Sequence, residues 1–193
     1  MAVDVVVFDV GETLVDETAA WIRIAHAAGV TPFTLMAALG ATIAQGRAHW
    51  HAWEILGIES PRDDVWGIDE WYPDAQPCLA RLRAGGYRVG VVGNTPATIE
   101  DELRPLVDFV GSAEGWGLEK PDPRFFARLV DESGAGPAKI AYVGDRVDND
   151  VLPALAAGMT AVHIKRGPWG YLQQPPPEAI RIESLDELPA VLP

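Results

Sequence analysis

Short apolar runs recur along the chain, and the intervals between most of them are long enough to hold a helix. Five of these runs are apolar enough to be strands buried on both faces: Val3–Phe8, Arg88–Val92, Phe109–Gly111, Ile140–Val143 and Thr160–Ile164. Strands of this kind are typical of parallel sheets covered by helices on both sides. The pattern therefore predicts a doubly wound α/β fold.

Residues that favour helix ends punctuate the stretches between these runs. Thr95 with Pro96, and Asp122 with Pro123, each suggest a capping residue followed by a proline in the first turn. The second of these helices is expected to end near Gly134.

The strand pattern stops between about Glu17 and Tyr72. Helix-like stretches replace it, separated by Gly29, Gly40 and Gly57; they are Ala19–Ala28, Pro32–Ala44 and Gly46–Leu56. We expect a helical insertion over the carboxyl edge of the sheet. Its aromatic residues either form the core of this insertion or line a pocket that faces the main domain; they are Trp21, Phe33, Trp50, Trp53, Trp66, Trp71 and Tyr72.

After the last long apolar run, residues 167–170 (GPWG) suggest a turn. Trp169 in this turn either packs in the interior or closes one side of a site. Residues 173–178 (QQPPPE) suggest an extended connector that leads to a short edge strand and a closing helix.

Charge and composition exclude several classes of function. The chain has 15 basic and 28 acidic residues, a net charge of −13, and no cluster of Lys or Arg, which argues against a nucleic-acid partner. No apolar stretch approaches the roughly 20 residues that cross a bilayer. The N-terminus lacks the pattern of a signal peptide, so we expect a cytoplasmic protein. No pattern specifies an oligomeric state.

Ligands of open α/β sheets bind outside the carboxyl ends of the strands, and the loops expected at this edge carry charged and polar residues. They are Asp9, Asn94, Thr95, Lys120, Asp145, Asp148, Asn149 and Asp150. Carboxylates that lie close together in a buried site repel one another, and this arrangement is costly unless cations offset the charge. Lys120 supplies one cation, and the all-oxygen donor set indicates Mg²⁺ as a second.

Four segments resemble, in order, the four motifs of the haloacid dehalogenase superfamily. They are "FDVGETL", "GNTP", "EKPDPRFF" and "VGDRVDNDVLPALAAGM". The resemblance implies a Rossmann-like three-layer α/β/α core with a parallel sheet, formed by residues 1–16 and 73–193. It also implies a small all-α cap, formed by residues 17–72.

The same resemblance implies roles for individual residues. Asp9 is the expected nucleophile, which attacks phosphorus and forms an aspartyl-phosphate that water hydrolyses. Lys120 is expected to neutralise Asp9 and the transferring phosphoryl group. The implied Mg²⁺ ligands are the Asp9 carboxylate, the backbone carbonyl of Gly11 and Asp145, with Asp150 ordering the shell.

Gly11 departs from the family pattern. Phosphatases of the family usually carry a second aspartate here, which protonates the leaving group and then activates water. Loss of a general acid and base typically removes roughly 10² to 10⁴ in rate. For the next residue, Glu12, we expect a solvated or structural role rather than that of a relocated acid.

Gly93 is a second departure, because a phosphate-binding Ser or Thr usually precedes Asn94. We expect Asn94, Thr95 and Lys120 to bind the phosphate. The Thr95 hydroxyl either replaces the missing one or caps the helix that starts at Pro96.

The favoured function is therefore a Mg²⁺-dependent phosphatase of a small phosphorylated metabolite. A haloacid-type dehalogenase would use Asp9 to attack carbon without a metal. The retained Asp145 and Asp150, and the lack of an aromatic residue at Gly11, argue against that alternative. A weakly catalytic or noncatalytic protein that binds metal and anion and acts through a partner is the third hypothesis.

Overall fold

Six strands form one sheet in the computed structural model of the chain, which describes residues 2–61 and 67–193. The strands are β1 (Val5–Phe8), β2 (Arg88–Gly93), β3 (Phe109–Ser112), β4 (Ile140–Gly144), β5 (Thr160–Ile164) and β6 (Ile180–Ile182). The five long apolar runs are thus confirmed as strands, and the expected edge strand is β6. Trp66 lies outside the described residues.

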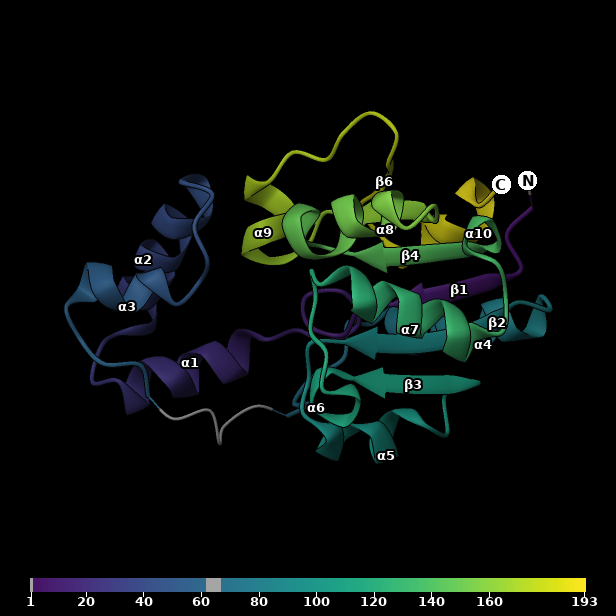
Figure 1. Cartoon of the computed structure of the whole chain (residues 1–193). Helices are drawn as coiled ribbons and strands as arrows, with labels where there is room; N and C mark the ends of the chain where they lie inside the picture. The colour runs from purple at the N-terminus through teal and green to yellow at the C-terminus, as the bar shows by residue number, and fades with distance from the viewer. Residues whose placement is uncertain (1, 62–66) are drawn as a thin grey trace.

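All neighbouring strands are parallel, in the order β3-β2-β1-β4-β5-β6. Side chains of β1 alternate between two hydrophobic clusters: Val6 and Phe8 face one, Val5 and Val7 the other. Figure 1 shows α7 and α8 covering the near face of the sheet. The three-layer α/β/α architecture expected from the sequence is confirmed.

The helices lie where the sequence places most of them. They are α1 (Thr18–Ala27), α2 (Pro32–Ala44), α3 (His51–Leu56), α4 (Ala75–Ala84), η1 (Ala97–Ile99), α5 (Glu100–Leu103), α6 (Ala113–Trp116), α7 (Pro123–Ser133), η2 (Pro137–Lys139), η3 (Val147–Val151), α8 (Leu152–Ala156), α9 (Gly167–Leu172), η4 (Leu185–Glu187) and α10 (Leu188–Val191). Asp122 caps α7 by accepting from the N–H of Arg124, and Gly134 ends it in the left-handed conformation.

Two expectations based on glycine are wrong. Gly40 does not separate helices but lies within α2, where burial of Leu39 and Ile43 against Trp169 outweighs the modest helix penalty of glycine. Residues 167–170 do not form a turn but begin α9. Proline is tolerated in the first turn of a helix, and Trp169 is buried there.

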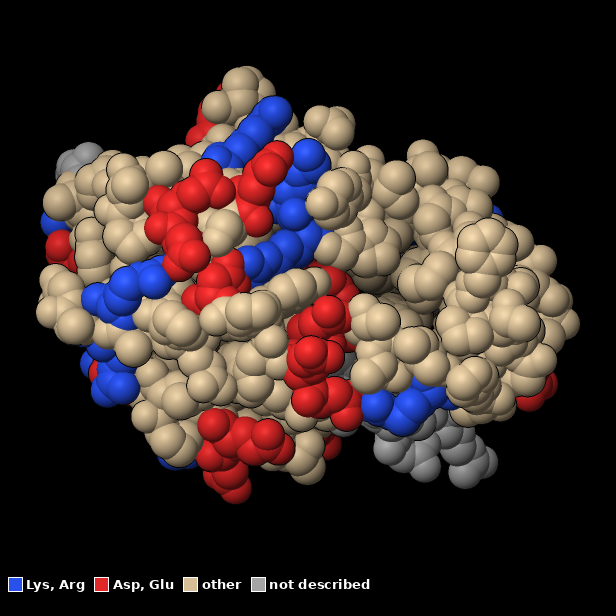
Figure 2. All heavy atoms as spheres, turned by 180° about the vertical axis from the view of Figure 1, so that it is seen from behind, with Lys and Arg blue, Asp and Glu red and all other residues tan. Residues whose placement is uncertain are grey.

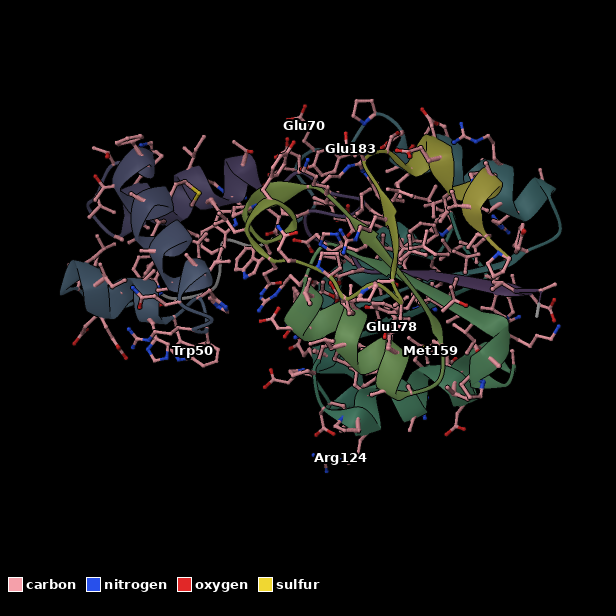
Figure 3. The ribbon with its side chains drawn as sticks, turned by 90° about the horizontal axis from the view of Figure 1, so that it is seen from above. Trp50, Glu70, Arg124, Met159, Glu178 and Glu183 are labelled. Carbon is pink, nitrogen blue, oxygen red and sulfur yellow. The ribbon has the colours of Figure 1, made fainter. Side chains whose placement is uncertain are left out.

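The helical segment, which we define as residues 18–58 with α1, α2 and α3, lies at one end of the core. In Figure 1 the strand arrows point towards it, and Figure 3 shows it, marked by Trp50, beside the core rather than over a sheet face. The buried Trp169 of α9 joins the two parts by packing on Leu39 and Ile43 and lying 6.3 Å from the Trp21 ring.

Within the described residues no individual helix is both long and apolar enough to cross a bilayer. The pair α1 and α2 reaches that length and composition only jointly, across a bend of 107°.

Candidate active site

The strand order reverses direction at β1, which is where ligands bind in doubly wound sheets. Asp9 follows β1 directly, and Asp145 follows the neighbouring β4. Phe8 pairs in register with Val143, and the N–H of Asp9 donates to the Val143 carbonyl at 2.9 Å. Because parallel register aligns the two strand ends, Asp9 and Asp145 emerge side by side.

Lys120 reaches this point from the loop before α7. Its ammonium donates to Oδ1 of Asp9 at 2.7 Å and to Oδ1 of Asp150 at 2.6 Å, and all three residues are buried. The side chain of Asn94 binds the backbone of this loop. Its amide oxygen accepts from the backbone N–H of Lys120 at 2.7 Å, and its amide nitrogen donates to the Lys120 carbonyl at 2.9 Å. Asn94 therefore positions Lys120, and its contact with phosphate stays a prediction.

Asp150 is brought inward by η3, a π-helical turn. Its Oδ2 accepts from the N–H of Arg146 at 2.9 Å, so both carboxylate oxygens have protein partners. A Cβ on Gly144 would overlap this carboxylate, which explains the glycine at the end of β4. Asp148, two residues earlier, instead pairs with the Arg146 guanidinium at 2.9 Å and does not join the cluster.

The buried charges perturb one another. Burial raises the pKa of Asp145 well above its usual range, and the negative charges of Asp150 and Asp9 raise it further. Burial also raises the pKa of Asp150, to about 6, although Lys120 opposes the shift. Burial alone would lower the pKa of Lys120, but Asp150 and Asp9 outweigh it and raise the pKa well above its usual value.

The residues present fit a divalent cation. One carboxylate oxygen from each of Asp9, Asp145 and Asp150 lies within 4.8 Å of the others. Among the described residues, the buried Oδ2 of Asp145 has no hydrogen-bond partner, although a buried acceptor normally has one. Three carboxylates face one ammonium, so a dication would balance the charge, and all-oxygen donors suit Mg²⁺. The contribution of the Gly11 carbonyl stays a prediction.

The loop after β2 approaches the Asp9 carboxylate closely. A Cβ on Gly93 would lie 2.5 Å from Oδ1 of Asp9, so glycine suits this arrangement of the carboxylate. Thr95 is buried nearby, and its N–H donates to the Gly93 carbonyl at 2.9 Å. The helical turn η1 begins after Pro96 without a side-chain cap, so the expected capping role of Thr95 is wrong.

Glu12 has a structural role, as expected, but it is buried rather than solvated. Its Oε2 accepts from the Tyr72 hydroxyl at 2.6 Å and its Oε1 from the N–H of Glu17 at 3.1 Å. Burial raises the pKa of Glu12, and the bond from Tyr72 opposes the rise. Glu12 therefore links Glu17 and Tyr72, the two ends of the helical insertion expected from the sequence, to the loop that follows Asp9.

Sequence reasoning missed two features of the site. The ring of Tyr142 lies beneath Lys120, 5.5 Å from the ammonium, and its hydroxyl donates to the Val92 carbonyl at 2.8 Å. Its position in the apolar run of β4 was the only available signal. The second feature is the carboxyl group of Glu17, which lies against Gly11; their separation in sequence carried no signal for it.

Together, the fold and the site define an α/β protein with a buried, lysine-bridged carboxylate centre at the switch point of a doubly wound sheet. A model of the haloacid dehalogenase-like hydrolase family matches residues 3–158. The chain belongs to the haloacid dehalogenase-like hydrolase family.

Individual relatives carry different names within this family. The chain is 36% identical over 104 residues to a glyceraldehyde 3-phosphate phosphatase of Methanopyrus kandleri, which covers 51% of this chain and 45% of the relative. The chain thus spans about half the length of the curated relatives it matches.

Two solved structures share the fold. The HAD phosphatase of Thermococcus onnurineus has a TM-score of 0.65 at 22% identity, covering 97% of both chains. The L-2-haloacid dehalogenase of Xanthobacter autotrophicus has a TM-score of 0.72 at 18% identity, covering 98% of both. One fold therefore serves both chemistries, and the site residues have to decide between them.

Proposed function

We propose that the protein is a Mg²⁺-dependent phosphatase of a small phosphorylated metabolite. The observation that carries this proposal is the centre of three buried carboxylates around one ammonium, in which Oδ2 of Asp145 has no partner within residues 2–61 and 67–193. A reaction in which Asp9 attacks carbon needs no metal ion, whereas a phosphoryl group arrives with negative charge that cations must offset. The Methanopyrus kandleri relative, a glyceraldehyde 3-phosphate phosphatase, supports the same class of reaction.

The residues divide the work as follows. Asp9 attacks phosphorus through its carboxylate, which forms an aspartyl-phosphate and releases the alcohol. Lys120 holds Asp9 in place and stabilises charge on the phosphoryl oxygens. Asp9 and Asp145, with the carbonyl of Gly11, would hold Mg²⁺, while Asp150 orders the shell and positions Lys120. The bound ion would supply further neutralisation of the phosphoryl oxygens.

We also propose a division into two parts. Residues 1–16 and 73–193 form the core that performs the chemistry, and residues 17–72 form a cap that contacts the organic part of the substrate. The support is the place of the helical segment beyond the carboxyl ends of the strands. Thr95 and Asn94, in the loop after β2, would line the phosphate site.

A panel of phosphorylated metabolites, assayed for phosphate release with Mg²⁺ and with EDTA, tests the proposal. We expect turnover that requires Mg²⁺ and that disappears in Asp9→Asn, whose amide is not a competent nucleophile. An Asp101→Asn variant, altered at an exposed carboxylate outside the site, serves as the control and should keep full activity. Metal-independent halide release from 2-haloacids would instead identify a dehalogenase, and neither activity would favour a noncatalytic role.

A further inference from the structure

The space beside Gly11 is occupied by another residue. The backbone of Gly11 is not in the left-handed conformation, so a side chain would cause no backbone strain there. A Cβ at this position would nevertheless overlap Oε1 of Glu17 and lie 2.6 Å from its Cδ. The three heavy atoms nearest to that Cβ all belong to the Glu17 carboxyl group. A carboxyl is therefore present where the missing aspartate side chain would begin, but it comes from residue 17.

Several contacts hold Glu17 in this position. It is the N-cap residue of α1 and is partly buried. The indole N–H of Trp21 donates to its Oε2 at 3.3 Å, and its own N–H donates to Oε1 of Glu12 at 3.1 Å. Glu12 is fixed in turn by the Tyr72 hydroxyl. Because Trp21 binds Oε2, Oε1 is the oxygen that is directed towards Gly11.

Neighbouring acidic side chains are engaged elsewhere. Both carboxylate oxygens of Glu12 accept hydrogen bonds from the ends of the inserted segment. Asp16 accepts from the N–H of Thr18 at 2.8 Å. Asp148 pairs with Arg146. The position of its carboxyl group against Gly11 therefore singles out Glu17 as the residue placed to serve this position.

We propose that Glu17 is the general acid and base of this site, in place of an aspartate at position 11. The inference rests on the proposed phosphatase function. In the first step the Glu17 carboxylic acid donates its proton to the ester oxygen. The P–O bond to the leaving group breaks with its electron pair on that oxygen, while Oδ of Asp9 bonds to phosphorus. The products of this step are a neutral alcohol, a Glu17 carboxylate and the aspartyl-phosphate.

In the second step the Glu17 carboxylate accepts a proton from water. The water oxygen bonds to phosphorus, and the bond between phosphorus and Asp9 breaks with its electrons returning to the carboxylate. Phosphate leaves, Glu17 is protonated again and Asp9 is free. No further reactant is needed.

The two halves of the reaction respond differently to the leaving group, which provides the test. Glycerol 2-phosphate is an alkyl ester whose alkoxide needs a proton as the bond breaks, whereas p-nitrophenyl phosphate releases a stable phenolate. In Glu17→Gln, the amide can still accept from Trp21. We therefore expect kcat/KM, which reports phosphoryl transfer to Asp9, to fall by about 10² to 10⁴ on the alkyl ester and much less on the aryl ester. Asp16→Asn, at the adjacent carboxylate, should leave the ratio of the two rates unchanged.

A second pair of variants moves the carboxyl back to position 11. Glu17→Ala should lose turnover of the alkyl ester. The double variant with Gly11→Asp should turn this ester over at least about tenfold faster than Glu17→Ala alone, because the space beside residue 11 is then empty. Gly11→Asp alone should gain little, since the new side chain competes with Glu17 for the same space. Melting temperatures of all variants show whether each one is folded.

The outcomes separate the two proposals. If Glu17→Gln leaves the turnover of both esters unchanged, or lowers kcat/KM equally for both, the role of Glu17 alone is overturned. Aryl turnover without any alkyl turnover in the wild type also overturns it. No Mg²⁺-dependent turnover of either ester, or full turnover by Asp9→Asn, overturns the proposed function and with it this inference.

Discussion

The carboxyl edge of the sheet and the helical segment beside it differ most in charge. Asp9, Asp145, Asp150 and Lys120 are all buried within a few ångströms of one another. Residues 18–58, by contrast, contain only three residues with a formal charge, Arg23, Arg47 and Glu54. Figure 2 shows this contrast on one face, where Asp, Glu, Lys and Arg gather over the core and the helical segment is mostly uncharged.

The strands that carry the site are also more deeply buried than the helical segment. Strands β1 and β4 are buried along their whole length, so the charges that follow them have rigid supports. The helical segment has a small core around Ala25, Leu35 and Trp53, and it leaves Phe33 and Trp50 exposed at 86% and 58%. Buried charges require exact hydrogen-bond partners, whereas an apolar surface tolerates change. The edge of the sheet is thus suited to fixed chemistry and the helical segment to variable contacts.

The largest effect should come from removing the cation of the centre. In Lys120→Ala, Asp9 and Asp150 lose their ion pair, and we expect kcat to fall by about 10² to 10³ and the free energy of unfolding by about 3–5 kcal/mol. Enzyme assays and urea denaturation measure the two. Lys165→Ala, which breaks an exposed pair with Glu183, should cost about 1 kcal/mol or less and leave activity intact. Equal losses in the two variants would contradict the contrast between the buried centre and an exposed ion pair.

The carboxylates should make stability depend on pH and on metal. The folded-state pKa values of Asp145 and Asp150 are raised, so their contribution is fully present below the unfolded pKa and is lost as pH rises through the folded pKa. For Asp150 this window lies between 3.8 and about 6. In EDTA, Asp145→Asn should therefore lose less stability than the wild type as the pH rises above about 4.

Mg²⁺ should reverse the loss in the wild type, by about 2.7 kcal/mol at 100 times its Kd, and have little effect on Asp145→Asn. Melting temperatures across the pH range, with and without excess Mg²⁺, measure both effects. Parallel curves for the two proteins would place the metal elsewhere.

A smaller effect is expected at the contact that ties the inserted segment to the site. Tyr72→Phe removes the hydroxyl that donates to the buried Glu12 carboxyl, and we expect it to lower the free energy of unfolding by about 1.5–3 kcal/mol. Tyr171→Phe, at a ring exposed at 63%, should change it by less than about 0.5 kcal/mol. Chemical denaturation of both variants makes the comparison. No difference between them would show that the bond to Glu12 contributes nothing.

The smallest effect should be found on the exposed surface of the helical segment. Phe33→Ser should change stability by less than about 0.5 kcal/mol. Two residues further along α2, Leu35 is fully buried, and Leu35→Ala should cost about 2–5 kcal/mol. Thermal unfolding of the two variants checks this. A large loss in Phe33→Ser would mean that its side chain is covered by a partner in solution.

Local patterns in the sequence were sufficient to predict most strands and the ends of α7. Strands buried on both faces are largely apolar, so β1, β2, β4 and β5 could be predicted from the local sequence pattern. Asp122 and Gly134 marked the ends of α7 because capping is a local interaction. Parallel strands bring their carboxyl ends to one edge, and this rule predicts that Asp9, Lys120, Asp145 and Asp150 lie close together.

Tertiary structure alone decided the contacts between residues that are distant in the chain. Gly40 lies within α2, and residues 167–170 begin α9. Trp169 of α9 packs against Leu39 and Ile43 of α2, and no local pattern encodes this contact. The sequence showed Gly11 as a missing side chain, whereas the fold fills its space with Glu17 from the start of α1. Local preferences depend on a residue and its neighbours, but the occupant of a space is set by how whole elements pack, and only the folded chain specifies that.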